Sequence, residues 1–64
     1  MGKIRRGGYV FITWVGDHDP KHVHVYKDGL EILKWDLESA LLMKGEFDRK
    51  AIRIIETLSA EGLL

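Results

Sequence analysis

The chain of 64 residues has no cysteine, a single proline and no net charge. The absence of cysteine excludes disulfides and thiolate metal sites. No apolar run approaches the roughly 18–20 residues of a membrane-spanning helix, and the basic start is not followed by a signal-peptide core. We therefore expect a cytoplasmic protein without membrane contact. Zero net charge also argues against a general nucleic-acid binder held mainly by phosphate contacts.

A chain of this length can form only a small core. It buries about 60% of the surface that its unfolded form exposes, and such a core rarely supplies more than roughly 3–5 kcal/mol. The hydrophobic content of 45% is nevertheless typical of a folded domain rather than a disordered chain. Further stabilisation must come from a histidine or carboxylate metal site, from self-association or from a partner. We expect a homo-oligomer or a complex with a cognate small protein.

The charges are unevenly distributed along the chain. Residues 1–27 contain five Lys or Arg and two acids, whereas residues 28–64 contain five Lys or Arg and eight acids. The first part therefore carries a net charge of +3 and the second a net charge of −3. This favours an anionic ligand near the basic part, although solvated surface charges would produce the same pattern.

The residue pattern predicts one domain over 1–64, of which residues 1–8 form a flexible basic N-terminus. Runs of aromatic, β-branched or alternating residues predict strands at 9–15, 22–26 and 30–36. A fourth strand at 41–43 is left open. A three-residue loop at 27–29 would place Val23 opposite Leu33 and His24 opposite Ile32.

The C-terminal part has a helical period. Asp48 is a suitable N-cap, and apolar residues recur at three- and four-residue spacing from Ala51 to Leu58 over about thirteen residues. Gly62 fits the position after the helix end, with Leu63 folding back toward Leu58. The expected fold is α+β: a small antiparallel sheet of three to four strands with one C-terminal helix packed on one face.

The segment Asp17-His18-Asp19-Pro20-Lys21-His22-Val23-His24-Val25 contains all three histidines and the only proline. Strand spacing places His22 and His24 on one face together with Tyr26, whereas Val23 and Val25 face the core. His18 lies across a turn that Pro20 makes rigid. This clustering indicates a site.

Three interpretations of the cluster stay open. His18, His22, His24 and Asp17 could hold a divalent metal such as zinc. Alternatively, His18, His22 and His24 could perform acid–base catalysis on a phosphate ester, since histidine titrates near neutral pH. Lys21 would then contact the charge of the substrate and Tyr26 would share the face. In the third interpretation the histidines only shape a turn and cover an open sheet face.

A second basic feature lies at the start of the predicted helix. Arg49, Lys50 and Arg53 occupy its first turns, where the helix dipole favours negative charge. They form either a solvated face or a surface that docks phosphates or an acidic partner. The candidate ligand-binding residues are Lys21, Tyr26, Arg49 and Arg53.

The order of these features resembles a family of small bacterial proteins. An aromatic strand precedes an Asp-His-x-Pro-x-His-x-His-Val signature, followed by a Gly turn, a strand and a helix with a basic start. The matching residues are Asp17, His18, Pro20, His22, His24 and Val25, with Gly45 and 49–55 aligning more loosely. The family is a domain of unknown function that is often encoded in toxin–antitoxin-like gene pairs. The resemblance implies a cytoplasmic protein with a toxin–antitoxin role and leaves open whether it is an enzyme.

The leading hypothesis is a toxin–antitoxin-type component whose histidine cluster binds or acts on RNA or another phosphate ligand. In this hypothesis His22 and His24 form the acid–base pair, His18 is the third member, and Lys21 and Arg53 contact charge. The alternative is a non-catalytic binding module whose histidines hold a metal or shape a protein interface.

Overall fold

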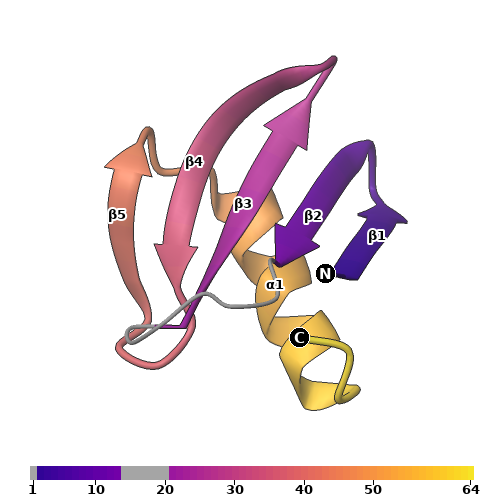
Figure 1. Cartoon of the computed structure of the whole chain (residues 1–64), viewed down its shortest axis with the longest axis vertical. Helices are drawn as coiled ribbons and strands as arrows, with labels where there is room; N and C mark the ends of the chain where they lie inside the picture. Colours follow the sequence, from indigo (N-terminus) through magenta and orange to yellow (C-terminus); the bar gives the residue numbers. More distant parts are fainter. Residues whose placement is uncertain (1, 14–20) are drawn as a thin grey trace.

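Five strands and one helix follow one another along the chain. The computed structural model describes residues 2–13 and 21–64. The elements are β1 (Gly2–Arg6), β2 (Tyr9–Thr13), β3 (His22–Lys27), β4 (Leu30–Asp36), β5 (Leu41–Gly45) and α1 (Arg49–Ala60). The strands form one antiparallel sheet in sequence order, and α1 packs on one face of it (Figure 1). The α+β class and the C-terminal helix are confirmed, whereas the expected three to four strands are corrected to five.

The additional strand is β1, which occupies most of the segment expected to be a flexible N-terminus. Ile4 of β1 lies opposite Phe11 of β2, and Arg6 lies opposite Tyr9. Gly7 and Gly8 connect the two strands with φ angles of 63° and 87°. Positive φ at both central residues is the geometry of a tight hairpin turn whose twist matches that of its strands. The two glycines therefore form a hairpin rather than a flexible end.

The β3–β4 hairpin has a shorter turn than the sequence suggested. Asp28 and Gly29 both have positive φ, at 54° and 79°, so Lys27 pairs directly with Leu30. The prediction of a three-residue loop was wrong, and Val23 lies opposite Trp35 rather than Leu33. A bulge leaves Ile32 as an extra residue on β4, so that His24 lies opposite Lys34 rather than Ile32.

The fourth expected strand exists and is longer, because β5 extends to Gly45. This glycine has a φ of 87°, and a Cβ placed on it would lie 2.2 Å from the carbonyl oxygen of Ile32 and 2.8 Å from the Cα of Leu33. Only a residue without a side chain allows β5 to approach β4 this closely. Gly45 therefore fixes the end of the sheet from which the chain turns into α1.

The core lies between α1 and the face of the sheet that it covers. Its buried residues from the sheet are Tyr9, Phe11, Val23, Val25, Leu33 and Trp35, and those from the helix are Ala51, Ile52, Ile55 and Leu58. The helical spacing of the last four gives α1 its single apolar face. Gly62 donates to the carbonyl of Ser59 and Leu63 to that of Leu58, as the predicted C-terminal motif requires. No helix in the described ranges is long and apolar enough to cross a membrane.

The N-terminus of α1 is attached to the sheet through Asp48. Its carboxylate accepts the Ala51 N–H at 3.1 Å, which confirms the predicted N-cap, and the buried Tyr9 hydroxyl at 2.9 Å. The Ala51 N–H holds the pKa of Asp48 below its usual value despite partial desolvation, and the Tyr9 hydroxyl, the Lys50 N–H and the charge of Lys27 act in the same direction. One carboxylate thus joins the helix start to β2.

A side chain at Gly45 would lower the stability for two reasons, the positive φ and the contact with β4, and a comparison with Gly8 separates them. Gly8 has the same φ of 87° but no atom within 4 Å of an added Cβ. We expect Gly8→Ala to cost about 1–2 kcal/mol, the usual penalty of a left-handed backbone. Gly45→Ala should cost roughly 1–3 kcal/mol more, because backbone atoms of β4 must move. Urea denaturation measures both, and an equal loss in the two variants would contradict the close approach.

The Asp48 cap predicts a specific loss of stability in acid. Its folded pKa is lowered, so its contribution is complete above the unfolded value of about 3.9 and is lost as the pH falls through the folded value. Asp48→Ala should lower stability at pH 7 by about 1 kcal/mol. Asp48→Asn keeps a capping oxygen without the charge, and is the control. Melting temperatures should show wild type and Asp48→Asn converging at low pH, and a constant difference between them would contradict this role.

Candidate functional site

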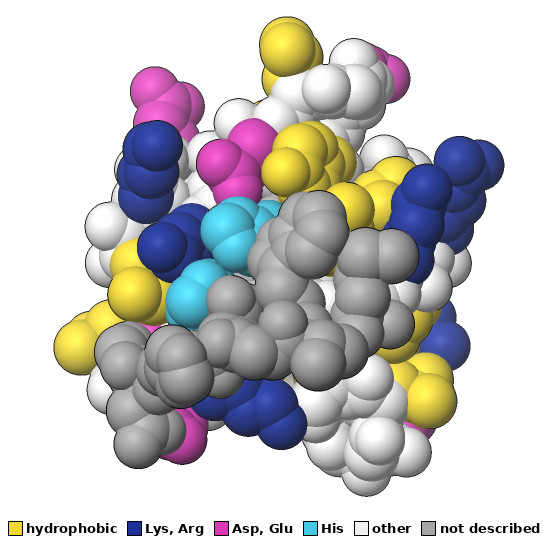
Figure 2. Space-filling model, viewed as in Figure 1, with side chains coloured by type: hydrophobic (Ala, Val, Ile, Leu, Met, Phe, Trp, Pro, Cys, Tyr) yellow, Lys and Arg dark blue, Asp and Glu magenta, His cyan; other side chains and the backbone are white. Residues whose placement is uncertain are grey.

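The face of the sheet opposite α1 carries the histidines. Val23 and Val25 are fully buried on the helix side, so His22, His24 and Tyr26 point the other way, as the alternation predicted. The two imidazole rings meet edge to face with their centroids 5.1 Å apart. Both residues are half-buried, and Figure 2 shows histidine side chains on this face with basic and acidic side chains beside them.

His24 is held by a carboxylate from the neighbouring strand. The two-residue turn at Asp28 and Gly29 places Glu31 opposite Tyr26, from where it accepts a hydrogen bond from the Nδ1–H of His24. The side chains of the two residues are 18% and 29% exposed, so this contact is partly screened from solvent. Donation from Nδ1 leaves the basic lone pair of a neutral ring on Nε2. A carboxylate that orients an imidazole in this way occurs in both catalytic and metal sites.

A row of residues crosses all five strands on this face. Lys3 of β1 lies opposite Ile12 of β2, Ile12 lies opposite His24, His24 lies opposite Lys34, and Lys34 lies opposite Lys44 of β5. Directly opposite residues in antiparallel strands point to the same side of the sheet. The row, which we call the basic row, therefore brings Lys3, Lys34 and Lys44 into line with His24.

Asp36 is buried and lies opposite His22 in the β3–β4 pair. It accepts the N–H of Glu38 at 2.8 Å, the N–H of Ser39 at 3.0 Å and the Ser39 hydroxyl at 3.0 Å. The Ser39 N–H is the main reason that the pKa of Asp36 is lowered, and His22 adds a smaller electrostatic effect. The carboxylate therefore holds the β4–β5 turn while adding negative charge beside His22.

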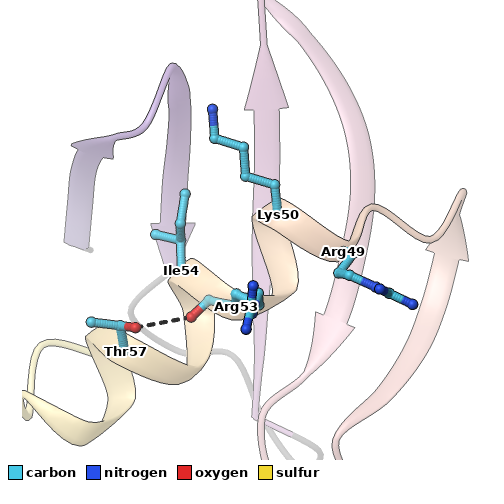
Figure 3. Close-up of a pocket in the computed structure, with 5 residues that line it drawn as sticks. All are labelled: Arg49, Lys50, Arg53, Ile54 and Thr57. Atoms are coloured by element: carbon cyan, nitrogen blue, oxygen red, sulfur yellow. Dashed lines mark hydrogen bonds between the residues drawn. The ribbon is translucent and has the colours of Figure 1, made fainter.

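The other site residues proposed from the sequence lie in two places. Tyr26 shares the histidine face, and Lys21 directly precedes β3, where its carbonyl accepts the Leu37 N–H at 2.9 Å. Arg49 and Arg53 lie on α1, on the opposite side of the sheet. They line a shallow depression of about 410 Å³ together with Lys50, Ile54 and Thr57 (Figure 3). Arg53 is therefore separated from the histidines by the sheet and does not belong to their site.

The remaining predicted residues lie outside the described part of the chain. These are His18, the rigid turn at Pro20 and Asp17, together with the end of the expected strand at 14–15. Within residues 2–13 and 21–64, no three His, Cys, Asp or Glu side chains are grouped so that they could hold a metal ion. The metal hypothesis of the sequence, which requires His18 or Asp17 as the third ligand, stays a prediction.

The comparison with known proteins identifies the family. Residues 7–61 match the family described as Domain of unknown function (DUF4160). The chain belongs to this family. No curated protein and no solved structure matches this DUF4160 domain. The match covers β2 to the end of α1, so His22 and His24 lie within the matched part, whereas β1 with Lys3 lies ahead of it.

Sequence reasoning missed four residues of the histidine face: Lys3, Glu31, Lys34 and Lys44. Glu31 could have been found from the Asp28-Gly29 pair, which is typical of a two-residue turn and places residue 31 opposite Tyr26 on the face of His24. The position of Lys34 depends on the bulge at Ile32, and that of Lys3 on an unexpected strand. No local signal in the sequence points to either.

Proposed function

We propose that this chain is a small RNA-binding component of a toxin–antitoxin-type pair and that its histidine face contacts the RNA. The observation that carries the proposal is the basic row, in which Lys3, Lys34 and Lys44 are aligned with His24 across five strands. The toxin–antitoxin context rests on the family resemblance. Membership of DUF4160 is consistent with that context and adds no function of its own.

The spacing of the basic row suits an extended polyanion. Adjacent strands lie about 4.8 Å apart, so the row extends over about 19 Å. Two acidic groups beside the histidines are engaged within the described part of the protein, since Glu31 binds His24 and Asp36 holds the β4–β5 turn. Tyr26 lies on the same face, where an aromatic ring can stack on an unpaired base. Single-stranded RNA is therefore the ligand class that these groups fit best.

The histidine pair adds the groups needed for cleavage of the bound strand. Glu31 orients His24 through Nδ1, so that Nε2 of the neutral ring would remove the proton from a ribose 2′-hydroxyl as that oxygen attacks the adjacent phosphorus. His22, whose ring centroid is 5.1 Å away, would in its protonated form give a proton to the departing 5′-oxygen. Lysines of the basic row would stabilise the charge on phosphorus.

A second candidate is a non-catalytic module that binds a metal. It is supported by the same closeness of His22 and His24, whose side chains point to one side of β3 and could share one ion. The hydrogen bond from His24 to Glu31 is the kind of contact that orients a metal-binding imidazole. Zinc is the metal that suits such ligands.

The RNA proposal predicts a salt-dependent affinity that depends on one face only. We expect Lys34→Gln/Lys44→Gln to weaken binding of a fluorescent single-stranded RNA. Loss of two phosphate contacts should reduce the slope of log K against log salt by about 1.4. Arg49→Gln/Arg53→Gln removes the same charge from the helix side and should leave both quantities unchanged. Fluorescence anisotropy at several salt concentrations measures them. Equal losses in the two variants, or no binding by the wild type, would refute the proposal.

The catalytic part predicts that cleavage can be lost without loss of binding. His22→Gln and His24→Gln should each slow cleavage of a labelled RNA by about 10²–10⁴-fold while the RNA affinity changes little. Glu31→Gln should slow it less, because the amide oxygen still accepts from Nδ1. Undiminished cleavage in His24→Gln would reject the acid–base pair. A zinc-dependent rise in melting temperature that both histidine variants abolish, without RNA cleavage, would favour the metal module.

A further inference from the structure

The two edge strands of the sheet differ in how well they are protected. β1 carries Lys3, Arg5 and Arg6 within five residues. β5 begins with Leu41, Leu42 and Met43, whose exposed fractions are 62%, 37% and 40%. An edge strand presents backbone N–H and C=O groups that can pair with another chain, and charged side chains are a common protection against this. β1 has that protection, whereas the apolar part of β5 does not.

We propose that β5 pairs antiparallel with β5 of a second copy of this chain, joining two five-stranded sheets into one. Three edge pairings between copies are available. Pairing of two β1 strands about Ile4 would place Lys3 opposite Arg5 of the second copy, and opposite like charges destabilise a sheet. Pairing of β1 with β5 would leave one edge open at each end and continue without closing. Pairing of two β5 strands closes as a twofold dimer.

The residues of β5 suit a twofold pairing. In an antiparallel twofold arrangement the central residue pairs with itself, and Leu42 is the middle of the three apolar residues. With Leu42 at the centre, Leu41 lies opposite Met43 of the second copy and Ala40 lies opposite Lys44, so the two lysines are kept apart. Phe47 is exposed, and its ring centroid lies 6.4 Å from that of Trp35. Its ring extends the apolar surface beside this edge. Figure 2 shows hydrophobic side chains at the lower part of the edge where Figure 1 places β5.

One feature of β5 acts in the opposite direction. A bulge leaves Met43 as an extra residue in its pairing with β4, and bulges are also a means by which proteins weaken sheet edges. Burial of three apolar side chains from each copy favours pairing, whereas the bulge shortens the paired segment. The mass of the protein in solution distinguishes a paired edge from a protected one.

The oligomeric state tests the proposal directly. We expect sedimentation at micromolar concentration to give twice the 7.4 kDa mass of the chain. Leu41→Lys/Met43→Lys, which gives β5 the kind of protection that β1 has, should reduce the mass to that of a monomer while circular dichroism stays unchanged. Leu30→Lys is the matched control: Leu30 is the more exposed at 71% but lies at the β3–β4 turn. A monomeric wild type, or a dimer that survives the double substitution, would overturn the proposal.

Single cysteines locate the contact, because the chain contains no cysteine of its own. The Cα atoms of directly opposite residues lie about 4.5–5.5 Å apart, which is within the range of a disulfide. Leu42→Cys should form an intermolecular disulfide under mild oxidation, more than Leu41→Cys or Met43→Cys. Leu30→Cys should form none. Equal cross-linking of Leu30→Cys, or none at the three β5 positions, would contradict the pairing even where the wild type is a dimer.

Discussion

Packing of Val23 and Val25 against α1 determines which way every other side chain of β3 points. Both valines are fully buried in the core. Because strand side chains alternate with a period of two, a shift of β3 by one residue would expose both valines and bury His22 and His24. The histidine face is therefore a direct consequence of core packing. The same packing brings the neighbouring strands into register, so the basic row depends on it as well.

Local signals in the sequence were sufficient for the elements that contact α1. Asp48, the apolar spacing of the helix and Gly62 predicted α1 and both of its caps correctly. The alternation from His22 to Tyr26 predicted the face of each residue in β3. Each of these features is decided by residues that are neighbours in sequence. The hydrophobic period and the capping residues are therefore enough to predict these features.

Turn geometry was the point at which sequence reasoning failed. Gly7 and Gly8 are predicted to end a flexible segment, although a pair of residues at positive φ can equally join two strands. The predicted loop at 27–29 is one residue longer than the turn at Asp28 and Gly29, and this difference moves Glu31 from its position opposite Tyr26. A difference of one residue in a turn changes every cross-strand pair that follows. The bulge at Ile32 shifts the rest of β4 by one more residue, so the position of Lys34 opposite His24 could not be predicted from the turn alone.

Net charge is a poor guide to the electrostatics of this sheet. The chain is neutral, yet its histidine face aligns lysines from β1, β4 and β5 because the strands lie in sequence order. Lys44 ends the basic row at the same edge where Leu41 to Met43 would meet a second copy. An antiparallel twofold pairing has its axis perpendicular to the sheet, so both helices would lie on one side and both histidine faces on the other. The two basic rows would then lie on one continuous surface. Dimerisation would lengthen the surface offered to an extended anion, because it adds the basic row of the second copy.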